Sequence, residues 1–217
     1  MRYDAVLFDH DGVLVTLTDQ ELHLRGARRA FAAVGVEEPD PADVEALSIG
    51  VTAPLLEEVC GRYGVEPGAF WAARDEHTAA LQREAMRAGE KRPYDDTGAL
   101  AGLGLPLGVV SSNQLATVEY AVERFDLPAF RTVQAREPTV ESLRRKKPEP
   151  FYLERALSAL GAEGALFVGD SESDVVAARR AGIESAFLRR EHVADATLSA
   201  TPDHELASLS ELRALVR

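Results

Sequence analysis

The sequence predicts an α/β protein in which a doubly wound parallel sheet is interrupted by an inserted, all-helical domain. Two patterns indicate this fold class. From about residue 94 onward, short apolar runs alternate with helix-length segments, which is typical of parallel strands joined by short crossovers. Between residues 17 and 92 the strand signals vanish and helical periodicity replaces them. A chain of 217 residues has room for a core domain and such an insertion.

The first strand is expected over Ala5–Phe8, and two acids follow it directly. Asp9 and Asp11 are separated by a single histidine, and Gly12 then allows the backbone to turn sharply. Two carboxylates this close raise each other's pKa unless a cation lies near them. Mg²⁺ suits such a place because it takes oxygen ligands and tolerates neighbouring phosphate oxygens. Alone the pattern is weak, since surface turns use the same residues.

Four helices are expected in the insertion. Each has an N-cap residue or a proline near its start, and most have a glycine near their end. The expected helices begin at Thr18 or Asp19, at Pro41, after Thr52 and at Pro67, and they end at Gly35, near Ser48, near Gly64 and at Gly89.

The remaining chain alternates strands and helices. Strands are expected over Leu105–Val110, Arg131–Val133, Leu166–Val168 and Ser185–Leu188. Helices are expected over Leu115–Phe125, Pro150–Leu160 and Ser173–Ala181, with a terminal helix after Pro202. Polar side chains gather just after these strands or just before a helix: Ser111, Ser112 and Asn113; Lys147; and Asp170 and Asp174. Because ligands bind beyond the carboxyl ends of parallel strands, these residues are the candidate site.

In order and character, the four polar segments resemble the four motifs of the haloacid dehalogenase-like (HAD) hydrolase superfamily. The resemblance runs from about Arg2 to Leu188. Within the superfamily, the chain resembles phosphoglycolate phosphatase-like enzymes. The helical insertion between the first two motifs resembles the superfamily's C1 cap. The resemblance implies a Rossmann-like core of residues 1–16 and 93–217 and a cap of residues 17–92. It also implies Mg²⁺-dependent hydrolysis of a small phosphomonoester through an aspartyl phosphate.

The resemblance assigns catalytic and phosphate-binding roles to individual residues. Asp9 would be the nucleophile, and Asp11 would protonate the leaving oxygen and later activate water. Ser111 would hold the phosphate through its hydroxyl, helped by the backbone N–H groups of Ser112 and Asn113. Ser112 could be the functional hydroxyl instead. Lys147 would hold the charges of nucleophile and phosphate together, although it also belongs to a basic run, residues 144–147.

The implied metal ligands are Asp9, Asp11 through its backbone carbonyl, Asp170 and Asp174. Asp174 would act through water or by holding Lys147. Helix capping is an alternative role for the later two acids, and both roles can coexist. The histidine between the first two acids, His10, is interpreted as a packed side chain rather than a metal ligand.

Composition excludes several other classes of protein. The net charge of −12 argues against nucleic-acid and anionic-membrane partners. The single cysteine, Cys60, rules out an intramolecular disulfide and a cysteine-based zinc cluster. No apolar run approaches membrane-spanning length and we expect no signal peptide, so a cytoplasmic enzyme is expected.

Other activities of the superfamily can be weighed against these residues. Its dehalogenases lack the second aspartate, which is present here as Asp11. Its phosphonoacetaldehyde hydrolases need a lysine on the cap, and no lysine lies between Arg2 and Glu90. A phosphomutase of sugar phosphates stays open as the alternative, although Glu21 stands where hexose mutases carry a cap histidine. A catalytically idle phosphate-binding module is the alternative from another class.

Overall fold

The computed structural model describes residues 2–216, and these described residues divide into two compact units. The first unit comprises Met1–Leu17, Arg92–Ala135 and Arg145–Arg217. The second comprises Thr18–Lys91 and Arg136–Arg144. The short second segment of the second unit lies far along the chain from the insertion, in a stretch that the sequence alone assigns to the core.

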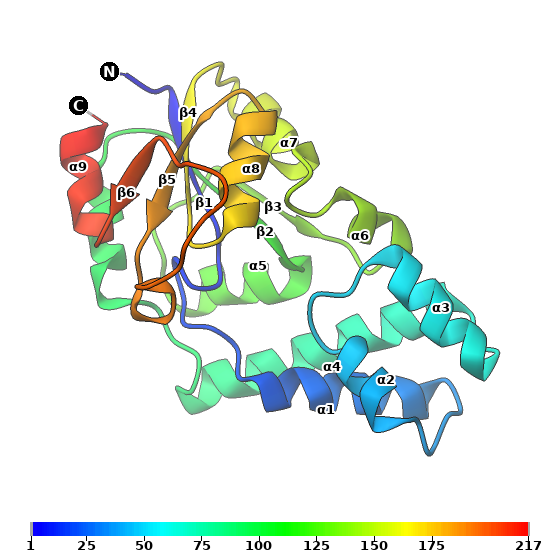
Figure 1. Cartoon of the computed structure of the whole chain (residues 1–217). Helices are drawn as coiled ribbons and strands as arrows, with labels where there is room; N and C mark the ends of the chain where they lie inside the picture. The colour runs from blue at the N-terminus through cyan, green and yellow to red at the C-terminus, as the bar shows by residue number, and fades with distance from the viewer. Residues whose placement is uncertain (1, 217) are drawn as a thin grey trace. The chain divides into compact units, whose positions relative to one another are not determined.

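A parallel sheet forms the centre of the first unit (Figure 1). Within the described residues it has six strands in the order β3-β2-β1-β4-β5-β6, and the neighbours of β1, β4 and β5 run parallel to them. Phe8 is level with both Val109 and Val168, so β1 ends beside its two neighbours. The predicted fold class is confirmed. The strands are β1 (Ala5–Phe8), β2 (Leu107–Gln114), β3 (Thr132–Arg136), β4 (Ala165–Gly169), β5 (Glu184–Leu188) and β6 (His204–Leu206).

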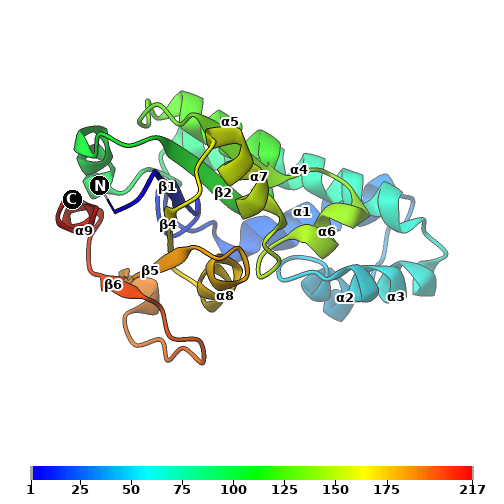
Figure 2. The ribbon, with the colours of Figure 1, turned by 90° about the horizontal axis from the view of Figure 1, so that it is seen from above.

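Both faces of the sheet are covered, and the side chains of β1 alternate between them. Ala5 and Leu7 belong to an apolar cluster with residues of α7 and α8, whereas Val6 and Phe8 belong to another with residues of α5 and α9. Figure 2 shows α7 and α8 together beside the strands and α9 on the opposite side. This two-sided burial explains why the strand is apolar throughout. The helices named here are α5 (Leu115–Arg124), α7 (Phe151–Leu160), α8 (Glu172–Arg180) and α9 (Leu212–Leu215).

The strand order reverses direction at β1, because the chain continues to β2 on one side and to β4 on the other. A crevice forms beyond the carboxyl ends of strands at such a point, and it is the usual ligand site of these sheets. Asp9 directly follows β1 and Asp170 directly follows β4. The topology therefore brings the two acidic motifs, which lie far apart in the sequence, to one place.

The second unit is helical, and local signals set its helix ends as predicted. Asp19 and Thr52 accept backbone N–H bonds as N-caps, while Gly64 and Gly89 end their helices in the left-handed conformation, with φ of 66° and 80°. Glycine takes this conformation without steric cost. The helices are α1 (Gln20–Ala33), α2 (Pro41–Ala46), α3 (Ala53–Tyr63), α4 (Pro67–Ala88) and α6 (Val140–Arg145).

A buried ion pair within the second unit joins Arg136, the last residue of β3, to Asp75 on α4. The guanidinium of Arg136 makes two contacts with the carboxylate of Asp75, at 2.6 and 2.8 Å, and lies 4.6 Å from the ring centroid of Trp71. Leu143 joins the same unit's apolar core. A bidentate, buried pair is geometrically demanding. It accounts for the grouping of Arg136–Arg144 with the insertion.

The C-terminal region corrects one prediction. The expected terminal helix after Pro202 is wrong in its first half, where His204–Leu206 pairs with β5 as the edge strand β6.

Short helical turns occur at η1 (Asp95–Gly102), η2 (Glu191–Val193) and η3 (Leu209–Glu211). Among the described residues, none of the helices combines the length and the hydropathy that crossing a membrane would require.

Candidate active site

The loop after β1 folds tightly on itself and so fixes the first two acids. The carbonyl of His10 accepts hydrogen bonds from the N–H groups of Leu14 and Val15, and the N–H of Gly12 donates to the carbonyl of Val15. Gly12 has φ of 77°, a conformation that side chains with a Cβ rarely adopt. The loop therefore holds Asp9 and Asp11 at the end of the strand with little freedom.

Lys147 lies at the centre of the site. Its side chain is only 3% exposed, and its Nζ lies 2.8 Å from Asp9 Oδ1 and 2.6 Å from Asp174 Oδ1. The ammonium also stands 5.4 Å from the ring centroid of Phe167, on β4. One buried cation thus joins the first and last acidic motifs, which is a contact expected of Lys147 from the resemblance. Although Lys147 belongs to a basic run in the sequence, its side chain is not part of an exposed basic surface.

Asp174 has a second task at the start of α8. Its Oδ2 accepts hydrogen bonds from the backbone N–H groups of Asp170 and Ser171, at 3.2 and 3.0 Å, and from the Ser171 hydroxyl, at 2.6 Å. The Ser171 hydroxyl in turn accepts from the Asp174 N–H, which completes a capping box. With Oδ1 on Lys147, both oxygens of Asp174 have partners in the protein. Capping and lysine binding therefore coexist in one side chain.

Charge in the site is unbalanced. Burial and the nearby carboxylates of Asp174 and Asp170 raise the pKa of Asp9 to about 7, although Lys147 pulls it down. Burial and Asp174 likewise raise the pKa of Asp170 to about 7. For Lys147, burial lowers the pKa, but Asp174 and Asp9 outweigh that effect and raise it above its usual value. Lys147 therefore stays protonated, whereas the carboxylates of Asp9 and Asp170 have too little positive charge beside them.

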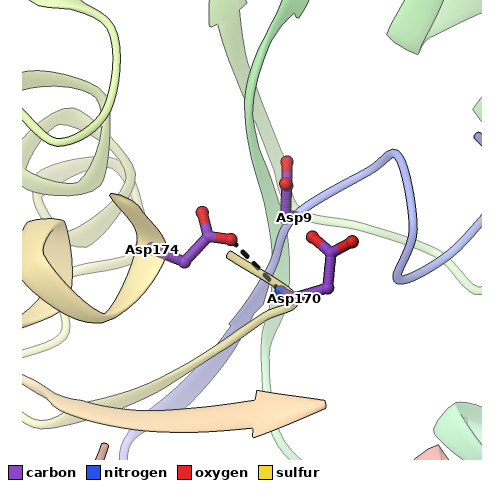
Figure 3. A group of neighbouring side chains, drawn as sticks. All are labelled: Asp9, Asp170 and Asp174. Carbon is purple, nitrogen blue, oxygen red and sulfur yellow. Dashed lines mark hydrogen bonds between the residues drawn. The ribbon is translucent and has the colours of Figure 1, made fainter. Parts of the chain in front are cut away.

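The same residues fit a divalent cation. Ligand atoms of Asp9, Asp170 and Asp174 lie within 4.8 Å of one another, and all three residues are buried (Figure 3). Three carboxylates against the single ammonium of Lys147 leave two negative charges, which matches one divalent cation. Hard oxygen donors of this kind suit Mg²⁺. Since Asp174 is occupied within the protein, Asp9 and Asp170 are the side chains placed to be its ligands.

Asp11 is oriented by two neighbours. Asn113 donates from Nδ2 to Asp11 Oδ2 at 2.6 Å, and His10 Nδ1 lies 3.2 Å from the same oxygen. His10 is fully buried, in keeping with its interpretation as a packed histidine. The backbone N–H of Asn113 donates to Ser111 Oγ at 3.1 Å. From the sequence, this backbone N–H group was expected to bind a phosphate, and the contact of the Asn113 side chain with Asp11 was not expected.

Sequence reasoning also missed a histidine at the site. His192, in η2 after β5, places its Nε2 2.6 Å from Asp170 Oδ2. Burial and the cation of Arg190 lower the pKa of His192. The residue lies outside all four motifs, in a polar loop without periodicity, so the sequence carries no signal for it. Only the pairing of β5 with β4 brings it to the site.

The sheet carries acids beyond two adjoining strands, with a buried lysine between them. Comparison with known proteins shows to which class of protein this arrangement belongs. A family profile described as haloacid dehalogenase-like hydrolase matches residues 3–182. The chain belongs to the haloacid dehalogenase-like hydrolase family. The predicted family and enzyme class are confirmed.

Curated relatives and solved structures agree with this assignment. The chain is 29% identical to a 5'-nucleotidase of Pseudomonas aeruginosa, over 98% of this chain and 95% of the relative. It is 29% identical to an N-acetylmuramic acid 6-phosphate phosphatase of the same organism, over 87% and 83% of the two chains. Crystalline CbbY from Rhodobacter sphaeroides in complex with phosphate has the same fold, with a TM-score of 0.70, 24% identity and coverage of 97% and 96%.

Proposed function

We propose that this chain is a Mg²⁺-dependent phosphatase that hydrolyses a small phosphomonoester through an aspartyl phosphate on Asp9. The proposal is carried by the buried cluster beyond β1 and β4, in which the acids outnumber their single cation, Lys147. Such a cluster can hold a divalent cation and the phosphoryl group that it neutralises. The curated relatives, named as a 5'-nucleotidase and an N-acetylmuramic acid 6-phosphate phosphatase, support the same class of reaction.

The first step is attack by the Asp9 carboxylate. Lys147 Nζ and the backbone N–H of His10 both contact Oδ1, at 2.8 and 2.7 Å, so the carboxylate is oriented before substrate binds. A carboxylate oxygen of Asp9 forms a bond to phosphorus as the bond between phosphorus and the leaving oxygen breaks. The ammonium of Lys147 offsets the negative charge of the phosphoryl group beside the carboxylate.

Asp11 moves the proton in both steps. In its acid form it gives a proton to the leaving oxygen, and the resulting carboxylate then takes a proton from water. That water attacks phosphorus, the acyl–phosphate bond breaks, and phosphate and the Asp9 carboxylate are released. The contacts of Asn113 and His10 with one oxygen of Asp11 keep the carboxyl group directed while it changes protonation state.

Asp9, Asp170 and the backbone carbonyl of Asp11 would hold the metal, with Asp174 acting through Lys147. When bound, Mg²⁺ supplies positive charge for the phosphoryl oxygens. Ser111, in the second half of β2, would bind a phosphate oxygen. Its Oγ accepts from a backbone N–H, which leaves its own hydroxyl hydrogen to donate.

The proposed substrate is a small phosphate ester, and hydrolysis is favoured over transfer. The relatives are named as a 5'-nucleotidase and an N-acetylmuramic acid 6-phosphate phosphatase, and this range supports a class of substrates rather than one particular compound. On α1, the position at which hexose mutases carry a histidine holds Glu21, and its carboxylate pairs with Arg28 at 2.7 Å. Glucose 1-phosphate with a bisphosphate primer should therefore release phosphate faster than it yields glucose 6-phosphate.

A substitution at each end of β1 tests the nucleophile. Asp9→Asn should keep the fold and lose turnover of a chromogenic phosphate ester with Mg²⁺, because the neutral amide cannot form the acyl phosphate. Asp4→Asn is the matched control, since Asp4 precedes the same strand and only accepts the backbone N–H groups of Glu163 and Gly164. Acid quenching of the wild type should trap a phosphoryl group on the peptide that contains Asp9. Turnover of Asp9→Asn within tenfold of wild type would contradict the proposal.

A further inference from the structure

One oxygen of Asp170 is enclosed by two other parts of the chain. His192 Nε2 lies 2.6 Å from Oδ2. A Cβ built on Gly12 would stand 1.9 Å from that same oxygen and 3.0 Å from His192 Nε2. Gly12 and His192 therefore cover Oδ2 together, and a side chain at Gly12 would fill the place where they meet. When Asp170 is ionised, as it would be on a metal, its oxygens only accept hydrogen bonds, so Nε2 is then the donor in this contact.

The loop that carries His192 is fixed to the loop after β1. Arg190, two residues earlier, makes a double contact with the Asp96 carboxylate at 2.8 and 2.9 Å and stands 3.9 Å from the ring centroid of Tyr94. It also donates to the carbonyl of Val13 at 2.9 Å, next to Gly12. Bidentate arginine contacts impose geometry as well as charge. His192 is thus held against Asp170 by the contacts of Arg190, two residues earlier in the chain.

We propose that His192 is a positioning residue of the metal site, and that it selects Mg²⁺ over Ca²⁺ by leaving Asp170 a single oxygen for the metal. The inference rests on the proposed function, because it requires a cation on Asp170. With Oδ2 bound by His192, only Oδ1 is presented, which makes Asp170 a monodentate ligand.

The difference between the two cations follows from their coordination. Mg²⁺ demands near-octahedral geometry with few protein ligands, whereas Ca²⁺ takes six to eight oxygens and accepts bidentate carboxylates. A carboxylate with one oxygen capped by a histidine can still be a monodentate ligand of Mg²⁺, but it cannot bind Ca²⁺ in the bidentate mode. Hydrogen-bonding partners behind metal ligands commonly contribute roughly 10–100-fold in affinity.

The chain contains a matched histidine–carboxylate pair away from the site. His204 Nε2 lies 2.8 Å from Glu184 Oε2, where β5 meets β6. The residues and the distance resemble the pair of His192 and Asp170, but Glu184 is not among the acids that cluster beyond β1 and β4. Loss of His204 removes a comparable contact without touching the proposed metal ligands.

The test is calorimetric titration of the metal-stripped full chain with MgCl₂ and, separately, with CaCl₂. His192→Asn should weaken Mg²⁺ binding by roughly 10–100-fold and Ca²⁺ binding less, because its shorter amide cannot reach Oδ2. His192→Gln, whose amide N–H reaches as far as Nε2, should recover most of the Mg²⁺ affinity and the selectivity. His204→Asn should bind both cations as the wild type does.

Each remaining outcome overturns the inference in a recognisable way. Unchanged Mg²⁺ affinity in His192→Asn would show that the histidine does not position Asp170. Equal losses for both cations, or no recovery in His192→Gln, would indicate general loosening of the loop. If the wild type binds no Mg²⁺, the proposed metal dependence falls together with this inference. Intact Mg²⁺ binding without phosphatase turnover would instead contradict only the proposed reaction.

Discussion

Replacing Lys147 by methionine tests whether one buried ammonium balances the site. The substitution keeps the length of the side chain and removes the charge from Asp9 and Asp174, at 2.8 and 2.6 Å. With an effective dielectric constant of about 20, each pair is worth about 6 kcal/mol before the cost of burying the ions is subtracted. Removing one partner of a buried pair typically costs roughly 3–5 kcal/mol. For a chain of this length, that loss lowers the melting temperature by roughly 10 °C.

The assay is differential scanning calorimetry at pH 8 in chelator. Fluorescence is unsuitable, since the single tryptophan, Trp71, lies in the second unit and the site lies in the first. The control is Lys146→Met, which removes the charge of the adjacent, half-buried lysine, leaves the contacts of Lys147 with Asp9 and Asp174 in place, and should therefore cost less than Lys147→Met. Adding Mg²⁺ should restore part of the loss in Lys147→Met. Equal melting temperatures for the two variants in chelator would refute the view that Lys147 balances these carboxylates.

Four further outcomes follow from the same geometry. Asp11→Asn should lower turnover by roughly 10²–10⁴-fold with little change in melting temperature, as steady-state kinetics and calorimetry would show. Gly12→Ala should weaken Mg²⁺ binding and lower stability, because its Cβ would meet Asp170 Oδ2 at 1.9 Å and its φ is positive; wild-type values for both would contradict this. In chelator, the free energy of unfolding should fall as the pH rises from about 4 to about 7, because Asp9 and Asp170 hold protons in the folded state that the unfolded chain has released. Denaturant titrations across that range measure this change. A flat profile would mean that the pKa values of the two acids are not raised. Chelator should abolish turnover, Mn²⁺ should partly restore it and excess Ca²⁺ should inhibit it, whereas full activity in chelator would argue for a metal-free reaction.

Much of the fold could be predicted because its signals are local. Buried strands such as Ala5–Phe8 are continuous apolar runs, and the helices of the insertion carry their own start and stop residues, such as Thr52 and Gly64. The edge strand His204–Leu206 has no such signal. It is three residues long, two of the three are polar, and it is recognisable only once β5 offers it a partner. Helical propensity in the following residues therefore misled the prediction there.

The residues of the site also differ in how well they could be predicted from the sequence. Asp9 and Asp170 were recognisable because each directly follows a strand, and Lys147 because it stands just before a helix. The fold brings these three residues together. Partners that act through tertiary contact were not. Arg190 and His192 lie on an irregular loop, and their importance comes from Asp96 and Asp170, 94 and 22 residues away along the chain. Sequence reasoning names residues that touch the reaction more readily than residues that hold those residues in place.

The buried pair of Arg136 and Asp75 has a consequence for modular exchange between relatives. Because Arg136–Arg144 shares a core with Thr18–Lys91, the helical unit is not one contiguous cassette. A chimera that transplants only the insertion would leave Arg136 without its carboxylate and Leu143 without its apolar neighbours. A graft intended to transfer substrate preference must therefore carry both segments, because the nine-residue piece that begins at Arg136 pairs with a helix residue 61 positions earlier in the chain.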